Sequence, residues 1–204
     1  VITVSSSYKG ASMPSVDYHI YGGKSGTWNF GGTIGSVMNL TLVVKSKIDD
    51  SWLVGCVLKS TVSDRGIPFE QLINWLESYR NDQSIDEPSI SAEAVAAGIV
   101  PPHNPMSYAD VDYCLVSKNG DTHYPLASIT KLMTAMVTLD YCSLDDILEI
   151  EQTDIQGGSG PLFYKGDKIT IRDALIALLL PSSNTLAIAL SRFVGNKILN
   201  IVNS

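Results

Sequence analysis

A serine and a lysine three residues apart stand at the start of an apolar segment with helical spacing. The segment extends from Tyr124 to Thr134, and the pair is Ser128 and Lys131. Residues i and i+3 of a helix lie on one face, so we expect the hydroxyl and the amine to meet. Serine becomes a good nucleophile when a base takes its proton, and a desolvated lysine can be that base. The spacing therefore predicts a nucleophile at Ser128 and a general base at Lys131.

The same pattern is expected by chance about once in a chain of this size, so alone it is a weak signal. It occurs a second time at Ser6 and Lys9, in a stretch that favours a strand. Positions i and i+3 of a strand point to opposite faces, so that copy is rejected. Two further motifs support the pair at Ser128.

A second polar motif lies between two apolar helical segments. Pro181 ends the segment 171–180, and Ser182, Ser183 and Asn184 form a turn before the next segment. Serine and asparagine favour turns and helix N-caps, so a cap for the following helix is the alternative to a catalytic role. The ordered combination of turn and helices is more specific than the turn alone.

A third motif joins a cation, a hydroxyl and a residue without a side chain in Lys24, Ser25 and Gly26, followed by Thr27. At a strand edge such residues supply an anchor for an anion and a backbone that a substrate approaches closely. A glycine-rich turn with an exposed lysine is the alternative. The spacing does not fit a phosphate-binding loop, and no helix follows.

Together the three motifs resemble those of the D-alanyl-D-alanine carboxypeptidases, the low-molecular-mass penicillin-binding proteins of the serine β-lactamase-like superfamily. The best-matching segment extends from Asp112 to about Asn200, and residues 17–80 are similar to the family's third motif with its last strands and final helix. The family usually has threonine at the position of Ser25, and serine keeps the hydroxyl. The resemblance implies an α+β fold with an antiparallel sheet flanked by helices.

The order of the motifs differs from the family, in which Ser-x-x-Lys comes first and Lys-Thr-Gly last. Here the lysine motif comes first, which predicts a circular permutant in one structural domain. We expect residues 1–80 to hold the sheet portion with this motif and the following helix, and 110–204 to hold further strands and the helical portion with the other two motifs. The polar, proline-rich segment 81–109 is expected to join the family's usual termini, with a short helix at 91–97. The helical lobe is expected to be reduced.

The resemblance implies an acyl-enzyme mechanism. Ser128 attacks the carbonyl of the penultimate D-alanine, and Lys131 takes the proton, its pKa lowered by burial and by the charge of Lys24. Ser182 relays a proton to the leaving D-alanine. Asn184 holds the peptide amide and positions Lys131.

The lysine motif is implied to bind substrate. Lys24 and Ser25 bind the terminal carboxylate, and Gly26 allows close approach. The backbone N–H groups of Ser128 and Thr27 form the oxyanion hole.

Composition excludes other classes of partner. A net charge of −7 over 204 residues argues against nucleic acid or an anionic membrane as partner, and no apolar segment of transmembrane length is expected. No metal or cofactor is expected, because the histidines and cysteines lack metal-ligand spacing. Cys56, Cys114 and Cys142 are expected to be buried free thiols, with a Cys56–Cys114 contact across neighbouring strands as the alternative.

These observations predict a D-Ala-D-Ala carboxypeptidase or transpeptidase-like enzyme that acts on peptidoglycan stem peptides and binds β-lactams as inhibitors. An extracytoplasmic location, in the periplasm or at the cell surface after secretion as a precursor, follows from the resemblance. Two alternatives stay open: a serine β-lactamase, and a catalytically weak or inactive domain that binds peptidoglycan or β-lactams. A homodimer formed by domain swapping is also compatible with the reduced lobe.

Periodicity predicts the remaining elements. Strands are expected at 1–8, 15–23 and 112–117, a hairpin of 39–47 with 51–58, an amphipathic helix at 67–77, and helices at 128–141 and 171–180.

Overall fold

The computed structural model describes residue 18 and residues 20–29, 36–60, 66–100 and 114–203. The chain divides into two units, Val1–Ile129 and Thr130–Ser204. The expected strand at 1–8 lies outside the described residues. The predicted α+β class with an antiparallel sheet and helices is confirmed.

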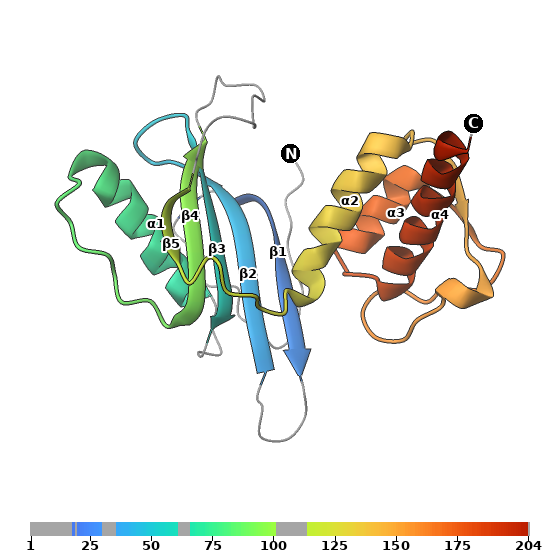
Figure 1. Ribbon diagram of the computed structural model, residues 1–204, viewed down its shortest axis with the longest axis horizontal. Coiled ribbons are helices and arrows are strands. Elements are labelled where there is room, and N and C mark those ends of the chain that lie inside the picture. The colour runs from blue at the N-terminus through green and yellow to red at the C-terminus, as the bar shows by residue number, and fades with distance from the viewer. Residues whose placement is uncertain (1–17, 19, 30–35, 61–65, 101–113, 204) are drawn as a thin grey trace. The chain divides into compact units, whose positions relative to one another are not determined.

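The first unit is built on a five-stranded antiparallel sheet in the order β1-β2-β3-β4-β5 (Figure 1). Its strands are β1 (Ile20–Asn29), β2 (Ser36–Lys45), β3 (Trp52–Ser60), β4 (Ala92–Val100) and β5 (Cys114–Lys118). The predicted hairpin is confirmed, since β2 pairs with β3 in a register that sets Val44 opposite Leu53. Among the strands that the structure describes, β1 lies at one edge of this sheet, and the lysine motif lies within β1.

Helix α1 (Gly66–Asn81) packs on one face of the sheet and confirms the predicted amphipathic helix. Phe69, Leu72 and Leu76 are fully buried, in one cluster with Leu53 and Val57 of β3. Burial of each such side chain contributes about 1.5–3 kcal/mol, so this contact stabilises the first unit.

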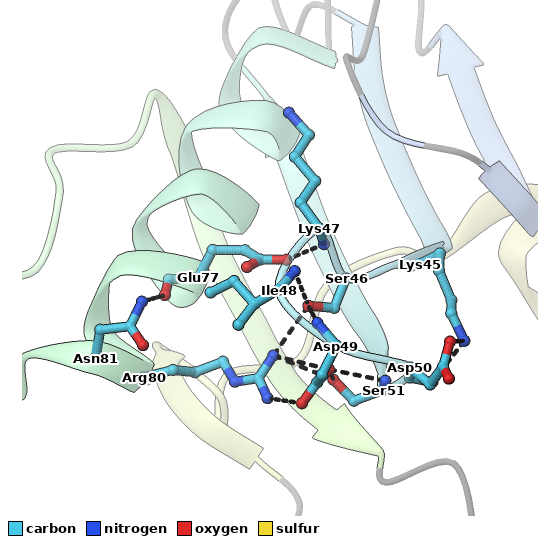
Figure 2. Close-up of polar contacts among 10 residues, drawn as sticks. All are labelled: Lys45, Ser46, Lys47, Ile48, Asp49, Asp50, Ser51, Glu77, Arg80 and Asn81. Atoms are coloured by element: carbon cyan, nitrogen blue, oxygen red, sulfur yellow. Dashed lines mark hydrogen bonds and ion pairs between the residues drawn. The ribbon is translucent and has the colours of Figure 1, made fainter.

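The turn between β2 and β3 is fastened to the last turn of α1 by Arg80 (Figure 2). The guanidinium donates to both carboxylate oxygens of Asp49, and to the hydroxyl oxygens of Ser46 at 3.0 Å and Ser51 at 3.1 Å. Hydrogen bonds from Arg80 and Ser51 hold the pKa of the Asp49 carboxyl well below its usual range. A planar cation with several donors can satisfy all three acceptors at once, which fixes the hairpin against the helix.

The short helix expected at 91–97 is wrong, because these residues form most of β4. This strand pairs with β3 on one side and β5 on the other. Alanine favours helices, but pairing on both sides and the burial of Ala94, Val95 and Ala97 override that preference. The role of 81–109 as a join between the family's usual termini stays a prediction.

The three cysteines are free, as expected, but their burial is not as expected. Cys114 is exposed, and Cys56 and Cys142 are half-buried. The alternative of a contact between Cys56 and Cys114 is excluded, because β4 lies between their strands.

The second unit holds three helices, α2 (Thr130–Tyr141), α3 (Ile171–Leu179) and α4 (Asn184–Val202), and the short strands β6 (Ile147–Glu149) and β7 (Lys168–Thr170) (Figure 1). The expected helices at 128–141 and 171–180 are confirmed with small shifts of their ends. Their core combines Ala135 of α2, Leu175 and Leu178 of α3, and Leu186 and Leu190 of α4. The short 3-10 helix η3 (Gln152–Asp154) lies between the two strands in the sequence.

By length and composition, α4 could cross a membrane, so the expectation that no segment reaches this length is wrong. Leu186, Ala189 and Leu190 are fully buried in the core of the second unit. Only 28% of the apolar window of the helix is buried, and Leu199, Ile201 and Val202 near its end are exposed, so core packing accounts for part of its apolar composition.

Candidate active site

In the first unit, the lysine motif lies on the edge strand β1. Lys24 and Gly26 are buried and Ser25 and Thr27 are exposed, as the pleat of a strand requires. The side chains of Lys24 and Ser25 therefore point to opposite faces of the strand. The amine of Lys24 donates to the backbone oxygen of Ser25 at 3.0 Å.

Gly26 lies against the short 3-10 helix η2 (Ala127–Ile129) that carries Ser128. A β-carbon built on this glycine would stand 2.5 Å from the backbone oxygen of Leu126 and 3.0 Å from the backbone nitrogen of Ser128. Contacts this short are not tolerated, so the absence of a side chain at Gly26 lets the nucleophile's segment reach the strand.

A buried amide holds the same segment from the neighbouring strand. Asn39 of β2 is 0% exposed, and its amide nitrogen donates to the backbone oxygen of Pro125 at 2.7 Å. Its amide oxygen accepts from the backbone nitrogen of Lys59 at 2.8 Å. Sequence reasoning gave Asn39 no role in the site, because its partners lie far away along the chain.

Ser128 itself is half-buried in η2, and the residue before it, Ala127, has a φ of 49°. This left-handed conformation is costly for a residue with a β-carbon, and such strain gathers at functional sites. Ser128 ends up in the first unit and Lys131 in the second, on either side of the division between Ile129 and Thr130. The meeting of hydroxyl and amine therefore stays a prediction from their spacing.

In the second unit, the structure brings Lys131, Ser182 and Asn184 together. The amine of Lys131 donates to the amide oxygen of Asn184 at 2.8 Å and to the hydroxyl oxygen of Ser182 at 3.2 Å. Lys131 is 7% exposed, and burial lowers the pKa of its amine from the ordinary value of 10.5. A lysine with a lowered pKa holds more of the neutral amine, the form that can accept a proton.

The turn before α4 serves as a helix cap and as part of this cluster, so the two alternatives for it are not exclusive. The hydroxyl of Ser183 accepts from the backbone nitrogen of Leu186 at 3.2 Å and caps α4. Ser182 has a φ of 62°, and it is this strained residue that reaches Lys131.

Sequence reasoning missed the loop Gly157–Gly160, which lies against the start of α4. The backbone oxygen of Gly157 accepts from the amide nitrogen of Asn184 at 3.2 Å, and that of Ser159 accepts from the backbone nitrogen of Asn184 at 3.1 Å. A run of three glycines around one serine was the available signal, since such a run often marks close backbone approach.

Within the described part of the chain, no group of three or more His, Cys, Asp or Glu residues could hold a metal ion. His19 and His103 lie outside the described residues, and His123 is exposed.

The site combines the buried amine of Lys131 with a hydroxyl and a carboxamide, and the candidate nucleophile Ser128 comes just before helix α2 in the sequence. Serine acyl-transfer enzymes that use lysine as a base have this set of residues. Comparison with known proteins agrees with this class. Residues 108–203 match the sequence model of the D-alanyl-D-alanine carboxypeptidase family, which confirms the family resemblance for that part of the chain.

One curated relative supports the same family. A D-alanyl-D-alanine endopeptidase of Pseudomonas aeruginosa is 42% identical over 87 residues, which is 41% of this chain and 28% of the relative. The chain thus spans less than a third of the length of this relative. The match to the family includes Ser128, Lys131, Ser182 and Asn184 and does not include residues 1–107 with the lysine motif.

Proposed function

We propose that this protein is a serine D,D-peptidase of peptidoglycan metabolism that forms an acyl-enzyme on Ser128. The observation that carries the proposal is the buried amine of Lys131, whose pKa burial lowers and whose hydrogen bonds go to Ser182 and Asn184. A lysine held neutral beside two polar side chains serves as a base, whereas a merely structural lysine would extend its charge to water.

The proposed reaction has two steps. Lys131 takes the hydroxyl proton of Ser128 as the oxygen bonds to the carbonyl carbon of the penultimate D-alanine. The bond from that carbon to the leaving nitrogen then breaks, and Ser182 passes the proton from Lys131 to the leaving amine. Water hydrolyses the ester and returns Ser128 to its free form.

On the strand side, the exposed hydroxyl of Ser25 and the backbone of Thr27 face substrate in this proposal. Ser25 donates to the terminal carboxylate, and the positive charge of Lys24, on the other face of the strand, adds attraction through the backbone. The backbone N–H groups of Ser128 and Thr27 stabilise the oxyanion.

Carboxypeptidase and endopeptidase activities are both candidates. The matching family is described by the first activity and the relative by the second. Both cleave the bond after a D-alanine, but an endopeptidase acts on cross-linked stem peptides. Digestion of purified muropeptides separates them: release of free D-alanine from pentapeptide monomers marks a carboxypeptidase, and conversion of cross-linked dimers to monomers marks an endopeptidase. Neither product from folded protein would contradict the proposed activity, and fast turnover of penicillin would instead favour a β-lactamase.

A circular permutation is part of the proposal. The segment expected to join the family's usual termini, residues 81–109, would contain β4. This strand pairs with β3, which precedes the segment, and with β5, which follows it, and this supports a join between two portions of one sheet.

Partners and location follow from the proposed activity. Substrates are peptidoglycan stem peptides that end in D-Ala-D-Ala, and β-lactams inhibit as mimics of that terminus. Peptidoglycan lies outside the cytoplasm, so the protein acts in the periplasm or at the cell surface after secretion. A domain-swapped dimer would show in the mass of the particle in solution.

A further inference from the structure

The loop Gly157–Gly160, together with the residue before the loop, makes four hydrogen bonds to the first turn of α4. The residue before it, Gln156, donates its backbone nitrogen to the hydroxyl of Thr185 at 3.1 Å and accepts from the same hydroxyl with its backbone oxygen at 3.1 Å. Asn184 is bonded to the loop through its backbone nitrogen and through its amide nitrogen. Thr185 is buried, so its two bonds to Gln156 are partly shielded from water, whereas the bond from the Asn184 amide to Gly157 is exposed.

Two glycines of the loop allow this contact. Gly158 has a φ of 110°, and a β-carbon there would stand 2.7 Å from the amide nitrogen of Asn184. Gly160 has a φ of 104°, and a β-carbon there would stand 2.5 Å from the α-carbon of Ser183. Gly166 has a φ of 91°, but no atom lies within 4 Å of a β-carbon built there. A side chain at Gly166 would therefore strain the backbone without contacting a neighbour. A side chain at Gly158 would therefore clash with the amide of Asn184.

The side chain of Asn184 also contacts Lys131, the candidate base. The two ends of an asparagine amide differ only in whether they donate or accept, so the partners decide its orientation. The carbonyl of Gly157 can only accept, which turns the nitrogen of Asn184 toward the loop. The amide oxygen then faces Lys131. A charged lysine amine has hydrogen-bond donors and no acceptor, so it requires an oxygen at this position. Both contacts select the same orientation.

The orientation matters for the lone pair of a neutral Lys131. A neutral amine has two N–H bonds and one lone pair. The amide oxygen of Asn184 accepts an N–H bond of this amine and has no hydrogen to donate to the lone pair. If the amide turned over, its NH₂ group would face the amine and donate to the lone pair, which would block proton transfer from the nucleophile.

We infer that the loop Gly157–Gly160 is a positioning element of the active site, which holds the Asn184 amide with its oxygen toward Lys131 and so keeps the lysine able to act as a base. The inference rests on the proposed function. It assigns no contact with substrate to the loop.

The test compares Gly158→Ala with Gly166→Ala in the full chain. Both substitutions strain a left-handed glycine, but only the first displaces Asn184. We expect the second-order rate of acylation by a fluorescent penicillin to fall at least about 10-fold in Gly158→Ala and to stay within about 3-fold in Gly166→Ala, because small displacements of catalytic groups have large effects on rate. Equal rates in the two variants would overturn the inference.

A second pair of variants tests the inference even if Gly158→Ala does not fold. Thr185→Val keeps the shape of the side chain and removes both bonds to Gln156, whereas Thr185→Ser keeps the hydroxyl. We expect slow acylation in the valine variant and recovery in the serine variant, with both proteins folded by circular dichroism. Slow acylation in both, or in neither, would contradict the inference.

A spectroscopic measurement separates failure of the inference from failure of the proposed function. The side-chain amide signal of Asn184 in a ¹⁵N–¹H spectrum, assigned by its loss in Asn184→Asp, should shift in Gly158→Ala and Thr185→Val and stay in place in Gly166→Ala. If the parent protein is not acylated at all, the proposed function fails, but this signal still reports whether the loop holds the amide. An unchanged signal in Gly158→Ala would overturn the inference whatever the parent's activity.

Discussion

Gly26 on β1 lies so close to η2 that a β-carbon on the glycine would stand 3.0 Å from the backbone nitrogen of Ser128. The glycine is therefore required by the position of the nucleophile's segment rather than by its own backbone conformation. Because that nitrogen is also a proposed oxyanion donor, the contact links the strand motif to the acylation chemistry.

Gly26→Ala should therefore impair acylation more than it impairs folding. The new methyl group would push Leu126 and Ser128 away from β1, and a displacement of this kind costs on the order of 100-fold in rate. Stopped-flow acylation by a fluorescent penicillin measures it. Gly22→Ala on the same strand is the control, since nothing lies within 4 Å of a β-carbon there. Equal rates in the two variants would show that the close approach does not matter.

The rate of acylation should rise with pH through an apparent pKa below 10.5, because burial lowers the pKa of Lys131 and the neutral amine is the active form. The free energy of unfolding should also rise with pH between the lowered pKa and 10.5, since the unfolded chain binds more protons in that interval. Lys131→Arg should remove this rise and reduce the rate above the pKa by about 10²–10⁴-fold, because a guanidinium does not give up its proton. A pH–rate profile that keeps its shape in Lys131→Arg would exclude Lys131 as the base.

Ser182→Gly should separate stability from activity. Its left-handed φ of 62° is costly for a residue with a β-carbon, so glycine should raise the free energy of unfolding by about 1 kcal/mol. The same change removes the hydroxyl beside Lys131 and should slow turnover of muropeptides. Ser182→Ala is the matched control, because it loses the hydroxyl and keeps the strain. If chemical denaturation finds the two variants equally stable, the strain is not real.

The ion pair between the buried Asp154 and the half-buried Arg192 should make the second unit sensitive to acid. The guanidinium donates to both carboxylate oxygens, at 2.9 and 2.7 Å, and these bonds lower the pKa of Asp154 from 3.8. The stabilisation is fully present above pH 3.8 and is lost as the pH falls through the lower pKa of the folded state.

Replacement of the pair's carboxylate tests the same contact at neutral pH. Asp154→Asn should lower the free energy of unfolding by about 2–3 kcal/mol, because it leaves Arg192 without its buried partner. Asp145→Asn is the control, since that exposed carboxylate lies 3.6 Å from Arg172 and should matter by less than about 0.5 kcal/mol. Equal unfolding curves for the two variants would contradict this account of the pair.

Local motifs could be predicted from the sequence because they depend on spacing along one segment. The amphipathic pattern over 67–77 placed α1, since its apolar residues repeat at helical intervals. The turn at Ser182 and Asn184 followed from a proline that ends one helix and capping residues that begin the next.

Features that depend on distant partners could not be predicted in this way. Strand β4 is rich in alanine and resembles a helix by composition, and only pairing with β3 and β5 makes it a strand. The buried amide of Asn39 bonds to Pro125, 86 residues away, and nothing near Asn39 in the sequence signals that contact. The sequence shows the glycines of the loop Gly157–Gly160, but it does not show that Gly158 lies against the side chain of Asn184.

The most direct test of the proposed chemistry is the intact mass of the protein after incubation with benzylpenicillin, measured beside Ser128→Ala. The account predicts one stable adduct of one penicillin per chain on the parent protein and none on the variant, with both proteins folded. No adduct on the folded parent, or an adduct that persists on Ser128→Ala, would contradict the assignment of Ser128 as the nucleophile.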